Sequence, residues 1–163
     1  MVRTTSKGTA VISLPSDTQI LVTREFNAPR HLVWRAFTTP ELAKRWWSGG
    51  MGEVTLVDMD LRVGGRWRHV LVTGDGTEVG FHGEYREVVP NELVVCTEVY
   101  EGSPGEESAL CSYAFTEADG RTTLTLRIDM ASKEDRDAML ESGMETGMQG
   151  QYDILEEIAI SLG

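Results

Sequence analysis

Residues 83–100, GEYREVVPNELVVCTEVY, indicate the fold most directly. The runs Val79–Val89 and Leu93–Tyr100 are rich in valine and other strand-favouring residues, and Pro90-Asn91 between them is typical of a turn. A connector this short joins antiparallel strands, because parallel neighbours need a crossover of about a dozen residues or more. The stretch therefore predicts an antiparallel hairpin.

The same alternation of strand-like runs and turns extends on both sides of this hairpin. Thr9–Leu14 and Thr18–Phe26 are expected as one extended stretch interrupted by a turn at Pro15-Ser16-Asp17, and further strands are expected at Val54–Met59, Gly65–Thr73, Ser108–Thr116 and Thr122–Met130. Two short helices are expected between the second of these runs and the third, from Pro29 to Phe37 and from Pro40 to Trp47. The short connectors predict a continuous antiparallel meander.

The C-terminal segment, Lys133–Leu162, has the periodicity of a long helix, and Ser132 is placed to cap it. Gly143, Gly147 and Gly150 lie inside it, and each costs about 1 kcal/mol relative to alanine. Either the helix bends at these glycines, or their bare backbone makes room for another group.

Together these elements predict an α+β fold. A curved antiparallel sheet of six to seven strands is expected around the long C-terminal helix, with two short helices after the first strand. The length of 163 residues suits one domain spanning residues 1–163, with residues 1–8 expected as a flexible tail.

The formal net charge of −11 is confined to one part of the chain. Residues 1–97 contain 11 acidic and 11 basic residues, whereas residues 98–163 contain 15 acidic and 4 basic ones. Such a surface repels phosphate backbones and anionic lipids, so neither nucleic acid nor a membrane is expected as a partner. The acidic residues of the C-terminal helix are expected on its solvated face, with a basic protein partner as the less favoured use.

Localisation is expected to be cytoplasmic. No apolar run is long enough to span a bilayer, and the first residues lack the apolar core of a secretory signal. Cys96 and Cys111 are far apart in sequence, which is typical of free thiols in a reducing compartment.

Several motifs closely resemble the family named for the activator of heat-shock protein 90 ATPase. They are Phe26–Leu42 with Trp46-Trp47, Asp60–Trp67, Gly83–Pro90 with Leu93-Val94, and Phe115–Glu117 before Gly120. The resemblance covers roughly residues 18–162 and implies the helix-grip fold of the START and birch-pollen-allergen (SRPBCC) superfamily. That superfamily contains carriers, cyclases, sequestering proteins and co-chaperones, so its fold does not select a function.

The resemblance has one departure, in the C-terminal helix. The family commonly carries a Gly-Trp pair there, whereas this chain has Gly147-Met148, and Tyr152 stands where an aliphatic residue is usual. If this helix forms the floor of a pocket, both side chains reshape it.

Aromatic and methionine side chains are the candidate lining of a ligand cavity between the sheet and the C-terminal helix, because large rings and flexible thioethers suit an apolar ligand. The candidates are Trp46, Trp47, Met59, Trp67, His69, Phe81, Tyr85, Tyr113, Met144, Met148 and Tyr152. Ordinary core packing is the alternative for the tryptophans and for the helix stripe. Since Trp46 and Trp47 are adjacent, one is expected to pack and the other to guard an entrance.

The polar candidates have structural alternatives. His69 and His82 lie on neighbouring expected strands and are candidates for acid/base chemistry, with hydrogen-bonded or exposed histidines as the alternative. Glu87 shares an expected strand face with Phe81 and Tyr85, and pairing with Arg62 or Arg66 is favoured over a catalytic role. The spacing of His and Cys suggests no metal, and no nucleotide or cofactor motif is present.

Three functions remain open. The favoured one is binding of a small hydrophobic or aromatic molecule without committed catalysis. The alternatives are an enzyme of cyclase or hydrolase type that uses a pocket His or Tyr, and a co-chaperone-like interaction domain. Convergence of His69, His82 or Tyr113 with a carboxylate would favour the enzyme. A homodimer and a chaperone partner are left open.

Overall fold

The computed structural model describes residues 10–102 and 108–163, so the tail expected at residues 1–8 lies outside the described residues. Within these ranges the strands are β1 (Val11–Ser13), β2 (Gln19–Phe26), β3 (Gly52–Met59), β4 (Arg66–Thr73), β5 (Glu78–Val89), β6 (Leu93–Tyr100), β7 (Ser108–Ala118) and β8 (Arg121–Asp129). They form one sheet in the order β1-β2-β8-β7-β6-β5-β4-β3. Every neighbouring pair is antiparallel.

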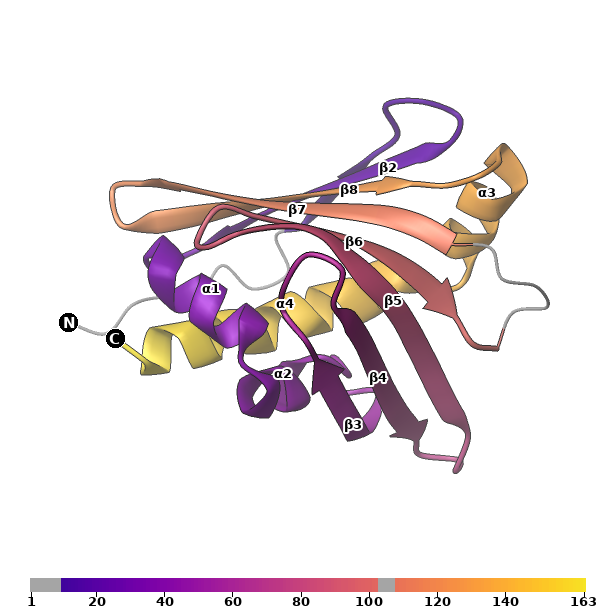
Figure 1. The fold of residues 1–163 in the computed structure, drawn as a ribbon, viewed down its shortest axis with the longest axis horizontal. Coiled ribbons are helices and arrows are strands. Elements are labelled where there is room, and N and C mark those ends of the chain that lie inside the picture. Colours follow the sequence, from indigo (N-terminus) through magenta and orange to yellow (C-terminus); the bar gives the residue numbers. More distant parts are fainter. Residues whose placement is uncertain (1–9, 103–107) are drawn as a thin grey trace.

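Four helices accompany the described part of the sheet: α1 (Arg30–Thr38), α2 (Pro40–Trp46), α3 (Lys133–Glu141) and α4 (Met144–Ser161). The sheet curves over α4, and α1 and α2 lie on the same side of the sheet as α4 (Figure 1). The expected α+β helix-grip fold is confirmed. The sheet has eight strands rather than six to seven, because the interrupted extended stretch at the start of the chain forms two paired strands, β1 at the edge and β2 beside it. No described helix has the length and apolar character needed to span a bilayer.

The expected single C-terminal helix is divided in two. Gly143 has a φ of 86°, a left-handed conformation that glycine adopts without steric cost, and it separates α3 from α4. The start of α3 agrees with the sequence, since the Ser132 hydroxyl accepts a hydrogen bond of 3.1 Å from the Asp135 backbone N–H.

Of the other two helix glycines, Gly150 makes room for the loop after α2, whereas a Cβ at Gly147 would make only an ordinary contact of 3.6 Å with the Met51 sulfur. A Cβ built at Gly150 would lie 2.4 Å from the Gly49 carbonyl oxygen, and one at Gly49 would lie 2.6 Å from the Gly147 carbonyl oxygen. The Gln151 side chain also donates a hydrogen bond to the Trp47 carbonyl. The bare backbone of α4 therefore lets α2 and its loop pack directly on this helix.

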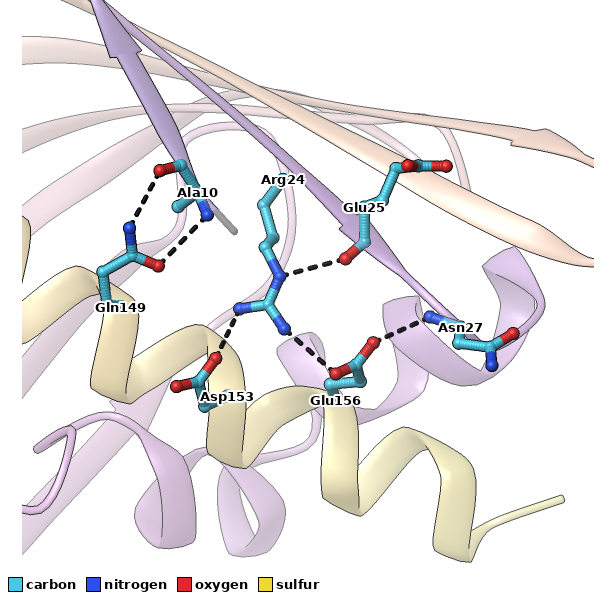
Figure 2. A network of polar contacts seen from close by, with 7 residues as sticks. All are labelled: Ala10, Arg24, Glu25, Asn27, Gln149, Asp153 and Glu156. Carbon is cyan, nitrogen blue, oxygen red and sulfur yellow. Dashed lines mark hydrogen bonds and ion pairs between the residues drawn. The ribbon is translucent and has the colours of Figure 1, made fainter. Parts of the chain in front are cut away.

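A buried polar network ties α4 to β2 (Figure 2). The fully buried guanidinium group of Arg24 donates to Asp153 at 2.8 Å and to the fully buried Glu156 at 3.0 Å. The second oxygen of Glu156 accepts from the Asn27 backbone N–H at 2.8 Å. Glu156 was expected on the solvated face of the helix; it is buried instead, because Arg24 supplies the countercharge.

Candidate functional site

Most of the candidate residues of the sheet gather on its concave face. Strand register places Met59 opposite Trp67, and His69 opposite Phe81. Tyr85 lies opposite Cys96, and Tyr113 opposite Val94.

Helix α4 supplies the candidates on the other side of the interior. Tyr152 faces these strands from α4 and is buried, with its ring 5.9 Å from the ring of Phe26. Met148 and Met144 precede Tyr152 by one and two helical turns on the same side of α4.

The adjacent tryptophans have different environments. Trp46 is buried against α1: its indole N–H donates to the Ala36 carbonyl at 2.9 Å, and its ring stacks on Phe37. Trp47 is partly accessible, and its ring meets those of His69 and Phe81 edge-on at 5.2 Å and 5.4 Å. Trp46 therefore joins the two short helices, whereas Trp47 reaches the concave face.

Gly83 allows Trp67 to cross the neighbouring strand. The indole N–H of Trp67 donates to the Thr97 carbonyl at 3.1 Å, although β5 lies between β4 and β6. A Cβ at Gly83 would lie 1.8 Å from that carbonyl oxygen and 2.7 Å from the indole nitrogen. The absence of a side chain at Gly83 therefore fixes the position of the Trp67 ring.

His69 is surrounded by aromatic rings. Its ring lies 5.0 Å from that of Trp67 and 5.2 Å from that of Trp47, and its residue is only 7% exposed. Within the described residues, its Nδ1 is a buried side-chain polar atom without a hydrogen-bond partner. Burial lowers the pKa of His69, so the imidazole is neutral at pH 7.

Glu98 is a carboxyl group on the concave face that the sequence analysis missed. The residues of β6 that point inward are Val94, Cys96 and Glu98. The Cys111 thiol donates to Glu98 Oε2 at 3.4 Å. Burial raises the pKa of Glu98 above its ordinary value, and the Cys111 hydrogen bond lowers it by less. Alternation along β6 from Val94 and Cys96 indicates the face on which Glu98 lies, but not its contact with Cys111.

The ionisable groups around Glu98 are uncharged near neutral pH. Burial is the main cause that raises the pKa of Cys96 to about 12 and the pKa of Cys111 well above its ordinary value. Burial likewise raises the pKa values of Tyr85, Tyr113 and Tyr152. The charge of Glu98 adds to the increase for both cysteines and for Tyr113 and Tyr152, which places these four side chains within its electrostatic reach.

The histidine pair does not converge. His69 points inward, whereas His82 is exposed on the outer face, where its Nδ1 lies 2.9 Å from Glu101. His82 pairs with Arg68, the residue before His69. Successive side chains of a strand point to opposite faces, so His69 and His82 lie on opposite faces of the sheet. The hypothesis that the two histidines act together in acid/base chemistry is therefore wrong.

Glu87 is also not where the alternation placed it. The register of β5 and β6 shifts between Tyr85 and Glu87, and this bulge turns Glu87 outward to an exposed position. Arg62, one of its expected partners, pairs with Asp60 at 2.9 Å. A single extra residue in β5 thus reverses which side chains face inward beyond Tyr85.

A shallow groove of about 360 Å³ lies on the outer face of β4 and β5 and contains few of the candidate residues. It is lined by Asp58, Arg66, Trp67, Arg68, His82, Gly83 and Glu101. Arg68 binds Glu101 through two hydrogen bonds of 2.8 Å and 2.9 Å, and this contact holds the pKa of Glu101 at about 2. Among the described residues, no three His, Cys, Asp or Glu side chains are grouped as metal ligands would be.

The raised pKa of Glu98 makes a prediction for stability. Above the pKa of an unfolded glutamate, about 4.3, the folded chain keeps a proton that the unfolded chain releases. Because of this group, the free energy of unfolding falls by up to about 1.4 kcal/mol for each unit by which the pH rises, until the pH passes the raised pKa. We expect Glu98→Gln to remove that loss, so that its stability relative to the wild type rises as the pH increases above about 5. Urea unfolding at a series of pH values measures it.

The exposed Glu92→Gln is the matched control for this change and should follow the wild type at every pH. A Glu98→Gln curve parallel to the wild-type curve would contradict the raised pKa.

The comparisons agree with this architecture. A protein from Rhodobacter sphaeroides has 27% sequence identity and a TM-score of 0.84, with 90% of this chain and 95% of that chain covered. One from Mycobacterium smegmatis has 25% identity and a TM-score of 0.78, with 94% and 97% covered. One from Arthrobacter aurescens has 19% identity and a TM-score of 0.82, with 94% of this chain and 92% of that chain covered, and it shares the fold.

No match was found among curated proteins. The sequence profile described as Activator of Hsp90 ATPase homolog 1-like protein matches residues 27–159. This range runs from the residue directly after β2 almost to the end of α4, and it includes the whole described concave face beyond β2. The chain belongs to the family of Activator of Hsp90 ATPase homolog 1-like proteins.

Proposed function

We propose that the protein binds a small hydrophobic or aromatic molecule between the concave face of the sheet and α4. One observation carries the proposal. Side chains from elements that face one another across the interior keep part of their surface accessible: Trp47, Met59, Phe81, Glu98, Tyr113, Met144 and Met148. In a fully packed core such positions lose nearly all accessible surface, as Cys111 and Leu155 do here.

The chemistry of these side chains also supports a small-molecule site. Most are apolar or aromatic, and Glu98 and the neutral His69 add a few polar groups among them. A mostly apolar lining with a small number of placed polar groups is typical of ligand pockets. The family fold is commonly a ligand-binding domain, which agrees with this assignment.

The uncharged fluorescent probe N-phenyl-1-naphthylamine tests the proposal. We expect saturable binding of about one probe per chain. At a concentration of about one hundred times Kd, binding adds about 2.7 kcal/mol of stability, or about 5–10 °C in melting temperature for a domain of this size. Fluorescence titration and thermal unfolding measure the two effects.

Met148→Trp should place a larger side chain one helical turn before Tyr152 and weaken binding of the probe by about tenfold or more. It should not lower the melting temperature of the protein without probe. Val63→Trp, at a position that is 63% exposed, is the matched control and should bind like the wild type. Equal binding by both variants would place the probe elsewhere on the protein. Absence of saturable binding would contradict the proposal.

One observation favours an enzyme as the second candidate. Tyr113 lies within the electrostatic reach of the Glu98 carboxyl group on the concave face. A buried carboxyl group with a raised pKa is suited to donate a proton. Turnover of aromatic esters that disappears in Glu98→Gln, while N-phenyl-1-naphthylamine still binds, would establish this function. Turnover that is the same in the variant would exclude Glu98 as its acid.

A further inference from the structure

We infer that the ligand bound on the concave face is an arylalkylamine, whose ammonium group pairs with the carboxylate of Glu98. This inference rests on the proposed function, because it names the chemical class that the same site accepts. Three features of the described residues carry it: the position of Glu98, the lack of a basic partner for it, and the aromatic rings beside it.

Glu98 lies among ionisable side chains that carry no positive charge. Cys111 on β7 donates a hydrogen bond to it, Cys96 is two residues away on the same strand, and Tyr113 on β7 and Tyr152 on α4 lie within its electrostatic reach. None of these four carries a positive charge in any protonation state. Its hydrogen bond from Cys111, at 3.4 Å, is a weak one. The carboxyl group therefore keeps capacity for a stronger donor.

No basic side chain in the described part of the interior competes for Glu98. The two buried arginines are held elsewhere, Arg24 by Asp153 and Glu156, and Arg136 by Asp137 and the Ser16 carbonyl. His69 is neutral near pH 7. A ligand ammonium group would meet a carboxyl group without an internal cation to displace, whereas a ligand carboxylate would meet no free positively charged side chain in the described interior.

The rings beside Glu98 suit an organic cation that carries a flat apolar body. Phe81 opposes Tyr100 and Tyr85 opposes Cys96, so the register between these pairs sets Gly83 opposite Glu98. The Trp67 indole crosses at Gly83 and binds the carbonyl of Thr97, the residue before Glu98. Tyr113 lies further along β7, opposite Val94, and within the electrostatic reach of Glu98. Aromatic faces next to a carboxyl group attract ammonium groups through the ring quadrupole as well as through charge.

Three probes with one ring system separate the possibilities: 1-naphthylmethylamine, its uncharged isostere 1-ethylnaphthalene and the anionic 1-naphthylacetic acid. We expect the amine to bind about tenfold more tightly than the hydrocarbon, and the acid to bind most weakly. Calorimetric or fluorescence titration at one ionic strength gives the three dissociation constants.

Variants then assign the preference to Glu98. In Glu98→Gln the dissociation constant of the amine should come within about twofold of that of 1-ethylnaphthalene, while the affinity for 1-ethylnaphthalene is unchanged. Glu98→Asp retains a carboxyl group and should keep part of the preference. Asp58→Asn removes an exposed carboxylate on β3 and is the control for general attraction to an acidic protein. A melting curve of each variant confirms folding.

Two results would overturn the inference and leave the proposed function standing: equal binding of the amine and the hydrocarbon, or a preference for the amine that survives in Glu98→Gln. If none of the three probes nor N-phenyl-1-naphthylamine binds saturably, the proposed function fails and the inference fails with it.

Discussion

Replacing Gly83 with alanine is expected to destabilise the protein by about 3 kcal/mol or more. The new Cβ would lie 1.8 Å from the Thr97 carbonyl oxygen, a backbone atom that a side-chain rotation cannot move away. It would also lie 2.7 Å from the Trp67 indole nitrogen and would break the hydrogen bond to Thr97. Relief of both contacts requires β5 and β6 to separate in the middle of the sheet.

Urea unfolding measures this loss as a lower midpoint. Gly74→Ala is the matched control, because no atom lies within 4 Å of a Cβ built at Gly74 in the loop between β4 and β5. It should remain within about 0.5 kcal/mol of the wild type. A Gly83→Ala variant as stable as Gly74→Ala would show that Trp67 does not cross β5 as described.

Removing the carboxylate of Glu156 should cost about 3–5 kcal/mol. Glu156→Ala leaves the guanidinium group of Arg24 fully buried with one of its two carboxylate partners, and it leaves the Asn27 backbone N–H without its acceptor. An uncompensated buried charge is more costly than the loss of the ion pair itself. Thermal and urea unfolding both measure the effect.

Two comparisons assign that cost to the buried pair. Glu157→Ala changes an exposed neighbour and should alter stability by less than about 0.5 kcal/mol. Arg24→Met combined with Glu156→Met removes both charges and should be much more stable than Glu156→Ala alone. A double variant as unstable as the single one would mean that packing around α4, rather than the isolated charge, causes the loss.

The sequence predicted the fold because hydrophobic period and turn chemistry act locally. The meander from β3 to β8 follows from strand-like runs joined by short turns, and the proline-led helices α1 and α2 lie where Pro29 and Pro40 indicate. The break between α3 and α4 depends on Gly143 adopting a left-handed φ, whereas Gly147 and Gly150 remain helical. Nothing in the local sequence distinguishes these three glycines, and of the three only Gly150 packs so closely on Gly49 that a Cβ would clash.

The candidate site was predicted less completely. Strand alternation correctly placed Phe81 and Tyr85 on one face of β5. It failed for Glu87, because the bulge in β5 depends on pairing with β6 and leaves no clear sign in the sequence. Glu98 was missed for a different reason: a glutamate in an acidic segment is usually solvated, and only the fold brings Cys111 against it.

Methionine methyl groups give the most direct test of binding inside the fold. In a ¹³C-methyl-methionine spectrum titrated with N-phenyl-1-naphthylamine, the proposal predicts saturable shifts for Met59, Met144 and Met148, which come from β3 and α4. Met130, which follows β8 and hydrogen-bonds to Thr18, should not move. Saturable shifts limited to Met130, or a spectrum unchanged at saturating probe, would contradict binding between the sheet and α4.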